Sequence, residues 1–290
     1  MIGICRLCRT ESDLQLSHII PKFIYKWFKE TSASPMRDSR NPNVRIQDGE
    51  KSYLLCSNCE ELFSKWENTF SQNIFHPLHQ EKREKYYLQY GEWCLKFAVS
   101  ISWRVLVYGK ENGLNHFSIE QMAKADEALE NWREFLLSNR KSPAPFDQQL
   151  FPLSKITDHS IANLSPFINR YFLRAVDVDI ACSDKRAFTY VKMGKMMLFG
   201  LIQENHPNHW KNGKIRVTHG VIGNEKYVLP FGLDKYISDR ANKAANIYPS
   251  MSPNQQNKIQ QYTLANEVKI GQSEIFKAMK QDFELFGDDA

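Results

Sequence analysis

The sequence has no long uninterrupted hydrophobic run. Its most apolar stretch, residues 97–108, is interrupted by Arg104 and is shorter than the roughly 18 apolar residues of a membrane-spanning helix. No membrane partner is therefore expected. The chain also shows no secretory signal before Cys5 and no internal repeats, and it has only 6 cysteines. Together these features predict a cytoplasmic protein in a reducing environment.

Signatures of two large enzyme classes are missing as well. The sequence contains no glycine-rich phosphate-binding loop and no elbow around a nucleophilic serine. We therefore do not expect a P-loop nucleotide hydrolase or a serine hydrolase. At 290 residues, 42% hydrophobic and 24% charged, the chain is typical of a globular protein with one large domain or two to three small ones. Its net charge of +5 suits an anionic partner without requiring one.

Four of the cysteines form two Cys-x-x-Cys pairs. Cys5 and Cys8 make the first pair, and Cys56 and Cys59 make the second. Each pair places two thiolates on one side of a tight turn, and two such pairs complete the tetrahedral four-sulfur site of structural Zn²⁺. The alternative is two disulfides or unrelated thiols, which the absence of a secretory signal disfavours. The spacing predicts a zinc ion that joins two distant segments of the chain.

Short elements surround the two pairs. Apolar alternation predicts a strand that ends at Pro21, and helical spacing of apolar residues predicts two amphipathic helices. A polar segment rich in Ser, Asn, Pro and Arg indicates a long loop. The predicted order is strand 14–20, helix 22–30, loop 31–51, strand 53–55 and a helix that begins near Cys59.

This segment resembles the HNH endonucleases of the ββα-metal class, in the variety that carries a four-cysteine zinc site. The resemblance covers residues 5–75. It implies a small ββα-metal module that hydrolyses phosphodiester bonds in DNA. The matching residues are the two Cys-x-x-Cys pairs, the stretch Leu16-Ser17-His18-Ile19-Ile20-Pro21, and Leu54-Leu55-Cys56 with Glu60 after the last cysteine.

The resemblance assigns catalytic roles to two residues. In the family, the histidine at the end of the first strand is the general base that activates water, and by position this is His18. A catalytic Mg²⁺ or Mn²⁺ ion stabilises the pentacovalent phosphate, and Glu60 occupies a position at which the family has a ligand. Without the resemblance, the alternation with Leu14 and Leu16 favours a packed histidine at position 18.

The sequence departs from the family pattern at several positions. Many members have Asp before the histidine as a metal ligand, whereas this chain has Ser17, and a hydroxyl is a poorer ligand for Mg²⁺. The middle Asn has two candidates, Asn43 and Asn58. Glu67 shares a helical stripe with Glu60 but lies about 10.5 Å further along the axis, too far to bind the same small ion comfortably. The alternative function is therefore a non-catalytic zinc-binding module for nucleic acid or protein.

The remaining residues predict a fold of the α+β class. The region 81–145 has helical periodicity, including a helix whose start Ser118 and Gln121 mark as a capping box. Three prolines indicate a linker over 141–153, strand alternation follows over 176–221, and an apolar helical stripe covers 275–286. The predicted domains are a zinc-stapled ββα-metal module at 1–80, a helical region at 81–145 and a mixed α/β region at 146–290.

Weaker hints concern partners. His76 and His79 form a possible metal pair, although the proline between them favours a loop. The C-terminal region is expected to contact a protein partner or a second copy of the chain, and defence against phage or other foreign DNA is the expected setting. Basic residues of the module are candidates for DNA phosphate contacts, with a solvated charged surface as the alternative: Lys22, Lys26, Arg37, Arg40 and Arg45.

Overall fold

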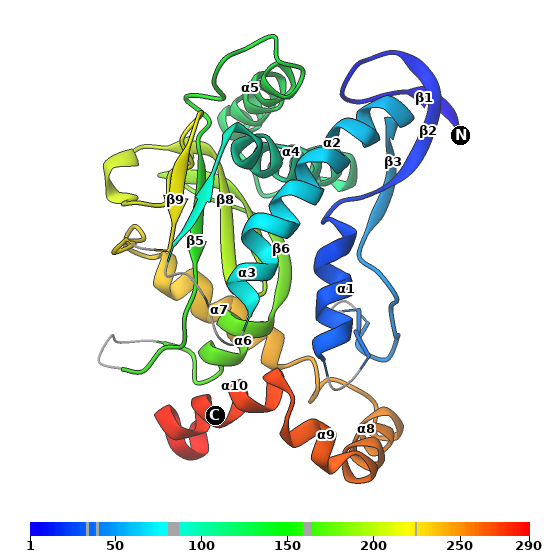
Figure 1. Cartoon of the computed structure of the whole chain (residues 1–290), viewed down its shortest axis with the longest axis vertical. Coiled ribbons are helices and arrows are strands. Elements are labelled where there is room, and N and C mark those ends of the chain that lie inside the picture. Colours follow the sequence, from blue (N-terminus) through cyan, green and yellow to red (C-terminus); the bar gives the residue numbers. More distant parts are fainter. Residues whose placement is uncertain (33–34, 39–40, 81–86, 159–163, 224) are drawn as a thin grey trace.

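In this computed structural model, the long helix α4 (Glu92–Asn112) lies between the N-terminal three-stranded sheet and a four-stranded sheet (Figure 1). The structure describes residues 1–32, 35–38, 41–80, 87–158, 164–223 and 225–290. Helices and sheets both contribute, so the predicted α+β class is confirmed. None of the described helices is long and apolar enough to cross a membrane.

The N-terminal segment forms a three-stranded antiparallel sheet in the order β1-β2-β3. His18 is the last residue of β2 and pairs with Lys51, the first residue of β3. The elements of this segment are β1 (Ile2–Ile4), β2 (Glu11–His18), α1 (Lys22–Thr31), β3 (Lys51–Cys56), α2 (Ser57–Phe70), a π-helical turn (Ser71–Phe75) and α3 (His76–His79).

The rest of the chain builds a four-stranded antiparallel sheet in the order β5-β8-β7-β6, and β4 pairs with β9. Helices α8 to α10 lie at the lower end of the molecule in Figure 1. The elements are β4 (Leu88–Tyr90), α4 (Glu92–Asn112), α5 (Ile119–Leu136), β5 (Gln148–Pro152), α6 (Ile168–Arg174), β6 (Val176–Ser183), β7 (Arg186–Met193), β8 (Met196–Glu204), β9 (Gly220–Ile222), α7 (Leu233–Ala245), α8 (Pro253–Ala265), α9 (Glu267–Gly271) and α10 (Glu274–Phe286).

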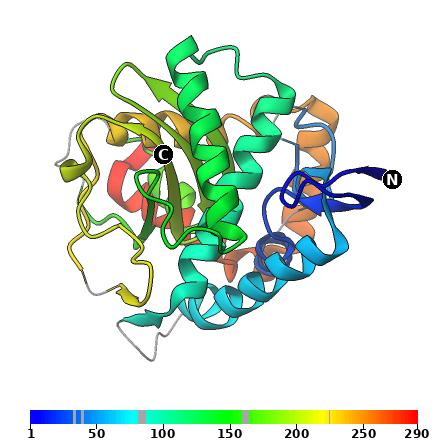
Figure 2. The same cartoon turned by 90° about the horizontal axis from the view of Figure 1, so that it is seen from above.

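Helix α4 is the centre of the hydrophobic core. It contacts α2 on one side and β6, β7 and β8 on the other. Seen from above, the N-terminal strands and the four-stranded sheet lie on different sides of it (Figure 2). One hydrophobic cluster contains buried residues of the cysteine-bearing segment, of α4 and α5, and of one face of β7 and β8. The other face of these strands belongs to a second cluster with α6 and α7. Both sheet faces are therefore covered, which explains the nearly continuous apolar runs of β7 and β8.

The start of α5 confirms the predicted capping box. The Ser118 hydroxyl accepts a hydrogen bond from the Gln121 main-chain N–H at 3.2 Å, and the Gln121 side chain accepts one from the Ser118 N–H at 3.1 Å. These two bonds satisfy main-chain donors that the first helical turn leaves unpaired.

Several predicted element boundaries are wrong. The predicted linker over 141–153 contains β5, because Gln148 and its neighbours are buried against β8. At the end of the predicted strand region 176–221, the structure has only the short strand β9 (Gly220–Ile222). Lys214, before it, makes an isolated bridge with Gln149. The pair His76 and His79 lies on the short helix α3 and not in a loop, because proline is tolerated in the first helical turn.

Three residues of the apolar stripe of α10 are exposed, although Met and Phe at helical spacing usually belong to a core. Phe276 and Phe283 are 45% and 57% exposed, and Met279 is exposed with them. The buried face of the helix carries Ala278 and Asp282 instead. Asp282 is held there because its carboxylate accepts hydrogen bonds from the main chain of α6, and a well-bonded buried carboxylate can replace an apolar side chain in a helix contact.

Candidate metal centre and hydrolytic site

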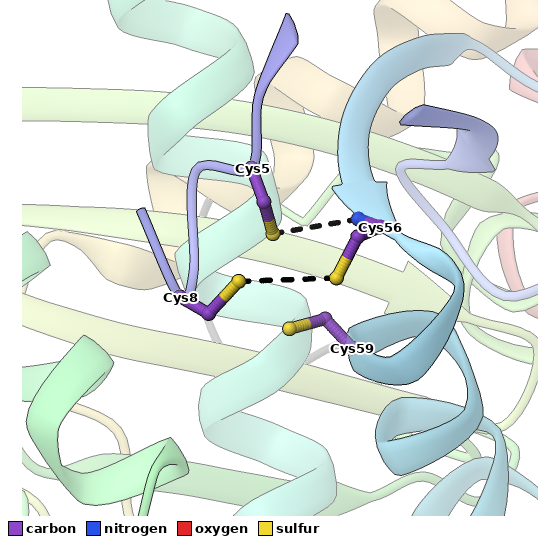
Figure 3. A group of neighbouring side chains, drawn as sticks. All are labelled: Cys5, Cys8, Cys56 and Cys59. Atoms are coloured by element: carbon purple, nitrogen blue, oxygen red, sulfur yellow. Dashed lines mark hydrogen bonds between the residues drawn. The ribbon is translucent and has the colours of Figure 1, made fainter. Parts of the chain in front are cut away.

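The four cysteines of the two Cys-x-x-Cys pairs meet in space (Figure 3). Their Sγ atoms all lie within 4.8 Å of one another, and the Sγ atoms of Cys8 and Cys56 are 3.8 Å apart. A regular tetrahedron with Zn–S bonds of about 2.3 Å has S···S edges of about 3.8 Å. The donor set and its dimensions therefore fit a metal ion such as zinc.

Tight local turns bring these sulfurs together. Cys5 follows β1, and the chain turns back with Arg9 in the left-handed region at φ 63°. Cys56 ends β3, while Cys59 lies in the first turn of α2. The Cys56 main-chain N–H donates to the Cys5 Sγ at 3.4 Å, and such a bond stabilises negative charge on a thiolate.

The cysteine environments differ in their effect on ionisation. Burial raises the pKa of Cys5 and of Cys59. Partial burial also acts to raise the pKa of Cys8, but hydrogen bonds from the main chain and side chain of Thr10 outweigh it and lower that pKa to about 6. Of these three thiols, Cys8 deprotonates most readily, and a bound cation would favour deprotonation of Cys5 and Cys59.

Charged contacts attach the first cysteine turn to the helices behind it. Arg133 of α5 donates to the main-chain oxygen of Leu7 at 3.2 Å, and Arg6 pairs with Glu111 of α4 at 2.7 Å. A third ion pair joins Arg9 to Glu130. The cysteine cluster therefore connects the N-terminal sheet, α2 and the α4–α5 pair.

His18 lies at the end of β2 beside Asp48. The two side chains are 18% and 20% exposed, and His18 Nε2 is 3.6 Å from Asp48 Oδ2. His18 Nε2 and Asp48 Oδ1 are buried atoms without a hydrogen-bond partner among the described residues. Unpaired buried polar atoms are rare in proteins, and they mark positions at which water or a ligand can bind.

Nearby lysines lower the pKa values of both His18 and Asp48. Lys51 lies 3.2 Å and Lys29 3.7 Å from Asp48 carboxylate oxygens. Burial, followed by the charge of Lys51, lowers the pKa of His18 below its ordinary 6.5, and Asp48 opposes that shift only in part. For Asp48, burial acts to raise the pKa, but the hydrogen bond and charge of Lys51 outweigh it and lower the pKa. At neutral pH, His18 is therefore neutral and Asp48 is ionised.

Ser17 and Glu60 occupy the positions at which the resemblance implies metal ligands, and the structure brings them into contact. The buried Ser17 hydroxyl donates to Glu60 Oε1. The His18 side chain, from the next residue of β2, lies beside Asp48. The shared cleft of His18 and Glu60 stays a prediction. Within the described ranges, the cysteine group is the only set of three or more metal-ligating side chains close enough to hold an ion.

Sequence reasoning missed two residues of this region, Asp48 and Arg104. Asp48 precedes Gly49 in a turn-forming dipeptide just before β3, so antiparallel pairing of His18 with Lys51 places it near the histidine. Arg104 donates to the main-chain oxygen of His18 at 2.9 Å. Its signal in the sequence was a single cation inside the most apolar stretch of the chain.

Other candidates from the sequence have different surroundings. His79 Nδ1 bonds the Phe75 oxygen, and its Nε2 accepts from the Lys195 N–H, both at 2.7 Å. That ring has no nitrogen left for a metal, so the interpretation as a metal pair with His76 is wrong. Asn43 accepts a hydrogen bond from the main chain at Ser252, and Arg40 lies outside the described residues.

No protein-family model, no curated protein and no solved structure matches the chain.

The cysteine cluster gives a direct prediction for metal content. We expect one zinc ion per purified chain, and Cys59→Ser should abolish stoichiometric binding and lower the free energy of unfolding by about 4 kcal/mol or more, because loss of a structural metal is among the largest single-residue effects. Elemental analysis and chemical denaturation measure both quantities. Cys182→Ser is the control, since Cys182 lies outside the cluster. A parent protein without stoichiometric metal would refute the assignment.

Proposed function

We propose that the N-terminal segment is a divalent-metal-dependent endonuclease of the HNH type that hydrolyses phosphodiester bonds in DNA. The observation that carries this proposal is the state of His18. Its ring is partly buried at a strand end, its Nε2 has no hydrogen-bond partner among the described residues, and a carboxylate and two lysines surround it. A packed core histidine would normally have its ring nitrogens paired.

The chemistry of a general base fits this environment. A neutral imidazole offers a lone pair to a water proton, and the lowered pKa keeps the ring neutral at physiological pH. Proton transfer creates an imidazolium, which Asp48 at 3.6 Å stabilises by charge attraction. His18 can thus accept the proton of an attacking water while Asp48 balances the charge.

The lysines around the pair suit a phosphate substrate. Lys51 and Lys29 contact Asp48, and Lys22 lies close enough to His18 to lower its pKa. Cations at this distance attract the phosphate backbone of DNA. They also argue against a divalent cation bound directly between His18 and Asp48, because like charges repel. The ion is therefore expected at Glu60, beside Ser17, and not between His18 and Asp48.

Glu60 is the carboxylate that would hold the catalytic ion, with Ser17 beside it. A divalent ion supplies Lewis-acid stabilisation of the phosphate when bound. Mg²⁺ commonly uses one or two protein carboxylates and completes its shell with water and substrate phosphate oxygens, so a single glutamate is a sufficient protein contribution.

The second candidate is a non-catalytic zinc module that binds nucleic acid or protein. One observation favours it. The Ser17 hydroxyl donates to one Glu60 oxygen, and a hydroxyl stands where many members of the resembled family have an aspartate. The two functions differ in whether DNA is cleaved or only bound.

The first test is cleavage of supercoiled plasmid DNA with Mg²⁺ or Mn²⁺. His18→Ala should lower the cleavage rate by about 10²- to 10⁴-fold, the usual contribution of a general base, with zinc content and fold unchanged. His76→Ala is the matched control, because His76 is an exposed histidine of the same segment. Parental cleavage by His18→Ala would contradict the assignment, and DNA binding without cleavage by the parent would favour the second candidate.

The pH dependence tests the state of His18. Because the pKa of His18 is lowered below 6.5, the neutral, proton-accepting ring predominates near pH 7. The kcat/KM for cleavage should therefore be level near pH 7 and fall as the pH drops through a midpoint below 6.5. Asp48 raises the pKa of His18, so Asp48→Asn should move the midpoint to a still lower pH. A midpoint above pH 7 in the parent would be inconsistent with a neutral base.

The metal dependence tests Glu60. Glu60→Ala should raise the Mg²⁺ concentration needed for half-maximal cleavage by about tenfold or more, because it removes the only carboxylate assigned to the ion. Glu61→Ala is the control, since Glu61 is exposed and pairs with Lys65 at 2.9 Å. Equal Mg²⁺ titrations for the two variants would remove Glu60 from the site.

A further inference from the structure

Arg104 is a buried arginine in the middle of helix α4. It is 2% exposed, although its neighbours on the helix are apolar core residues. Desolvating a guanidinium is unfavourable unless its donors are paired, so a buried arginine must have strong local partners. Its partners therefore show what this residue holds in place.

The partners of Arg104 belong to the two elements that carry the proposed catalytic residues. One terminal nitrogen, Nη1, donates to the main-chain oxygen of His18 at the end of β2, at 2.9 Å. The other, Nη2, pairs with Glu67 of α2 at 2.6 Å. Glu67 is on the same helix as Glu60, two turns further along.

The remaining contacts fix the guanidinium itself. Its Nε donates to the Ser100 oxygen on its own helix at 3.3 Å, and its Cζ lies 5.3 Å from the ring centre of Phe63 of α2. The group is thus held from three sides. A planar guanidinium with several fixed donors can join two elements at a set separation, which a lysine ammonium cannot do in the same way.

We propose that Arg104 is a positioning residue that holds the main chain at His18 at a fixed place relative to α2. This inference rests on the proposed function, because it makes a residue of α4 responsible for how the residues proposed to cleave DNA are arranged. The residue does not touch the substrate in this account. It acts through His18 and Glu67. The proposed cleavage centre therefore depends on α4, a helix outside the residues 5–75 that resemble nucleases.

The test compares Arg104→Met with Arg174→Met in the full chain. Arg174 is the matched control, because it is 3% exposed, stacks over Trp27 at 4.4 Å and joins α6 to Thr31 of α1 at 2.8 Å. Both substitutions remove a buried arginine that connects two elements, so both should lower thermal stability. Only Arg104→Met removes the contact with His18.

At a temperature at which both variants are folded, Arg104→Met should lower kcat for plasmid cleavage by about 10²-fold with little change in KM, the scale expected for a misplaced catalytic group. Arg104→Lys should recover part of kcat, because it keeps the positive charge and a hydrogen-bond donor group. Arg174→Met should retain the parental kcat. Equal loss of kcat in Arg104→Met and Arg174→Met would overturn the proposal.

A second readout does not need catalysis. In protein with labelled histidine, the His18 carbonyl carbon and ring signals should shift or broaden in Arg104→Met and stay unchanged in Arg174→Met. If the parent cleaves no DNA but this difference is seen, the proposed function fails, while the positioning of His18 by Arg104 is supported. If the His18 signals of Arg104→Met match those of the parent, the positioning role is refuted.

Discussion

The meeting of four cysteine sulfurs is the contact on which the N-terminal segment depends. Cys5 and Cys8 come from the turn after β1, and Cys56 and Cys59 come from the junction of β3 and α2. The antiparallel pairing of β2 with β3 fixes His18 opposite Lys51. The cysteine cluster joins the segments before and after this strand pair, and Glu60 directly follows Cys59.

A second constraint comes from outside that segment. Helix α4 contacts α2 and the four-stranded sheet, and its Arg104 reaches the main chain of His18. Ion pairs of Arg6 and Arg9 attach the cysteine turn to α4 and α5. A single hydrophobic cluster includes residues from all of these elements. The proposed hydrolytic site is therefore supported by the core of the larger protein and by the cysteine cluster together.

The sequence predicted the parts of the site that depend on local spacing. Each Cys-x-x-Cys pair and the Ser118 cap are encoded within a few residues, and they predicted the cysteine cluster and the start of α5. The surroundings of His18 could not be predicted in this way. Asp48 and Arg104 reach it through strand pairing and helix packing across 30 and 86 residues. The exposed stripe of α10 was missed for a related reason, since periodicity shows that a helix has an apolar face but not whether another element covers it.

The most direct test is a crystal structure of the His18→Ala variant with duplex DNA and Mg²⁺. The account predicts a scissile phosphate beside the vacated imidazole position, in contact with Lys51, and a magnesium ion bound by Glu60. The four cysteines should coordinate zinc in the same crystal, with Zn–S distances of about 2.3 Å. DNA bound on a distant face of the molecule, with Glu60 still bonded to Ser17 and no ion beside it, would contradict the account.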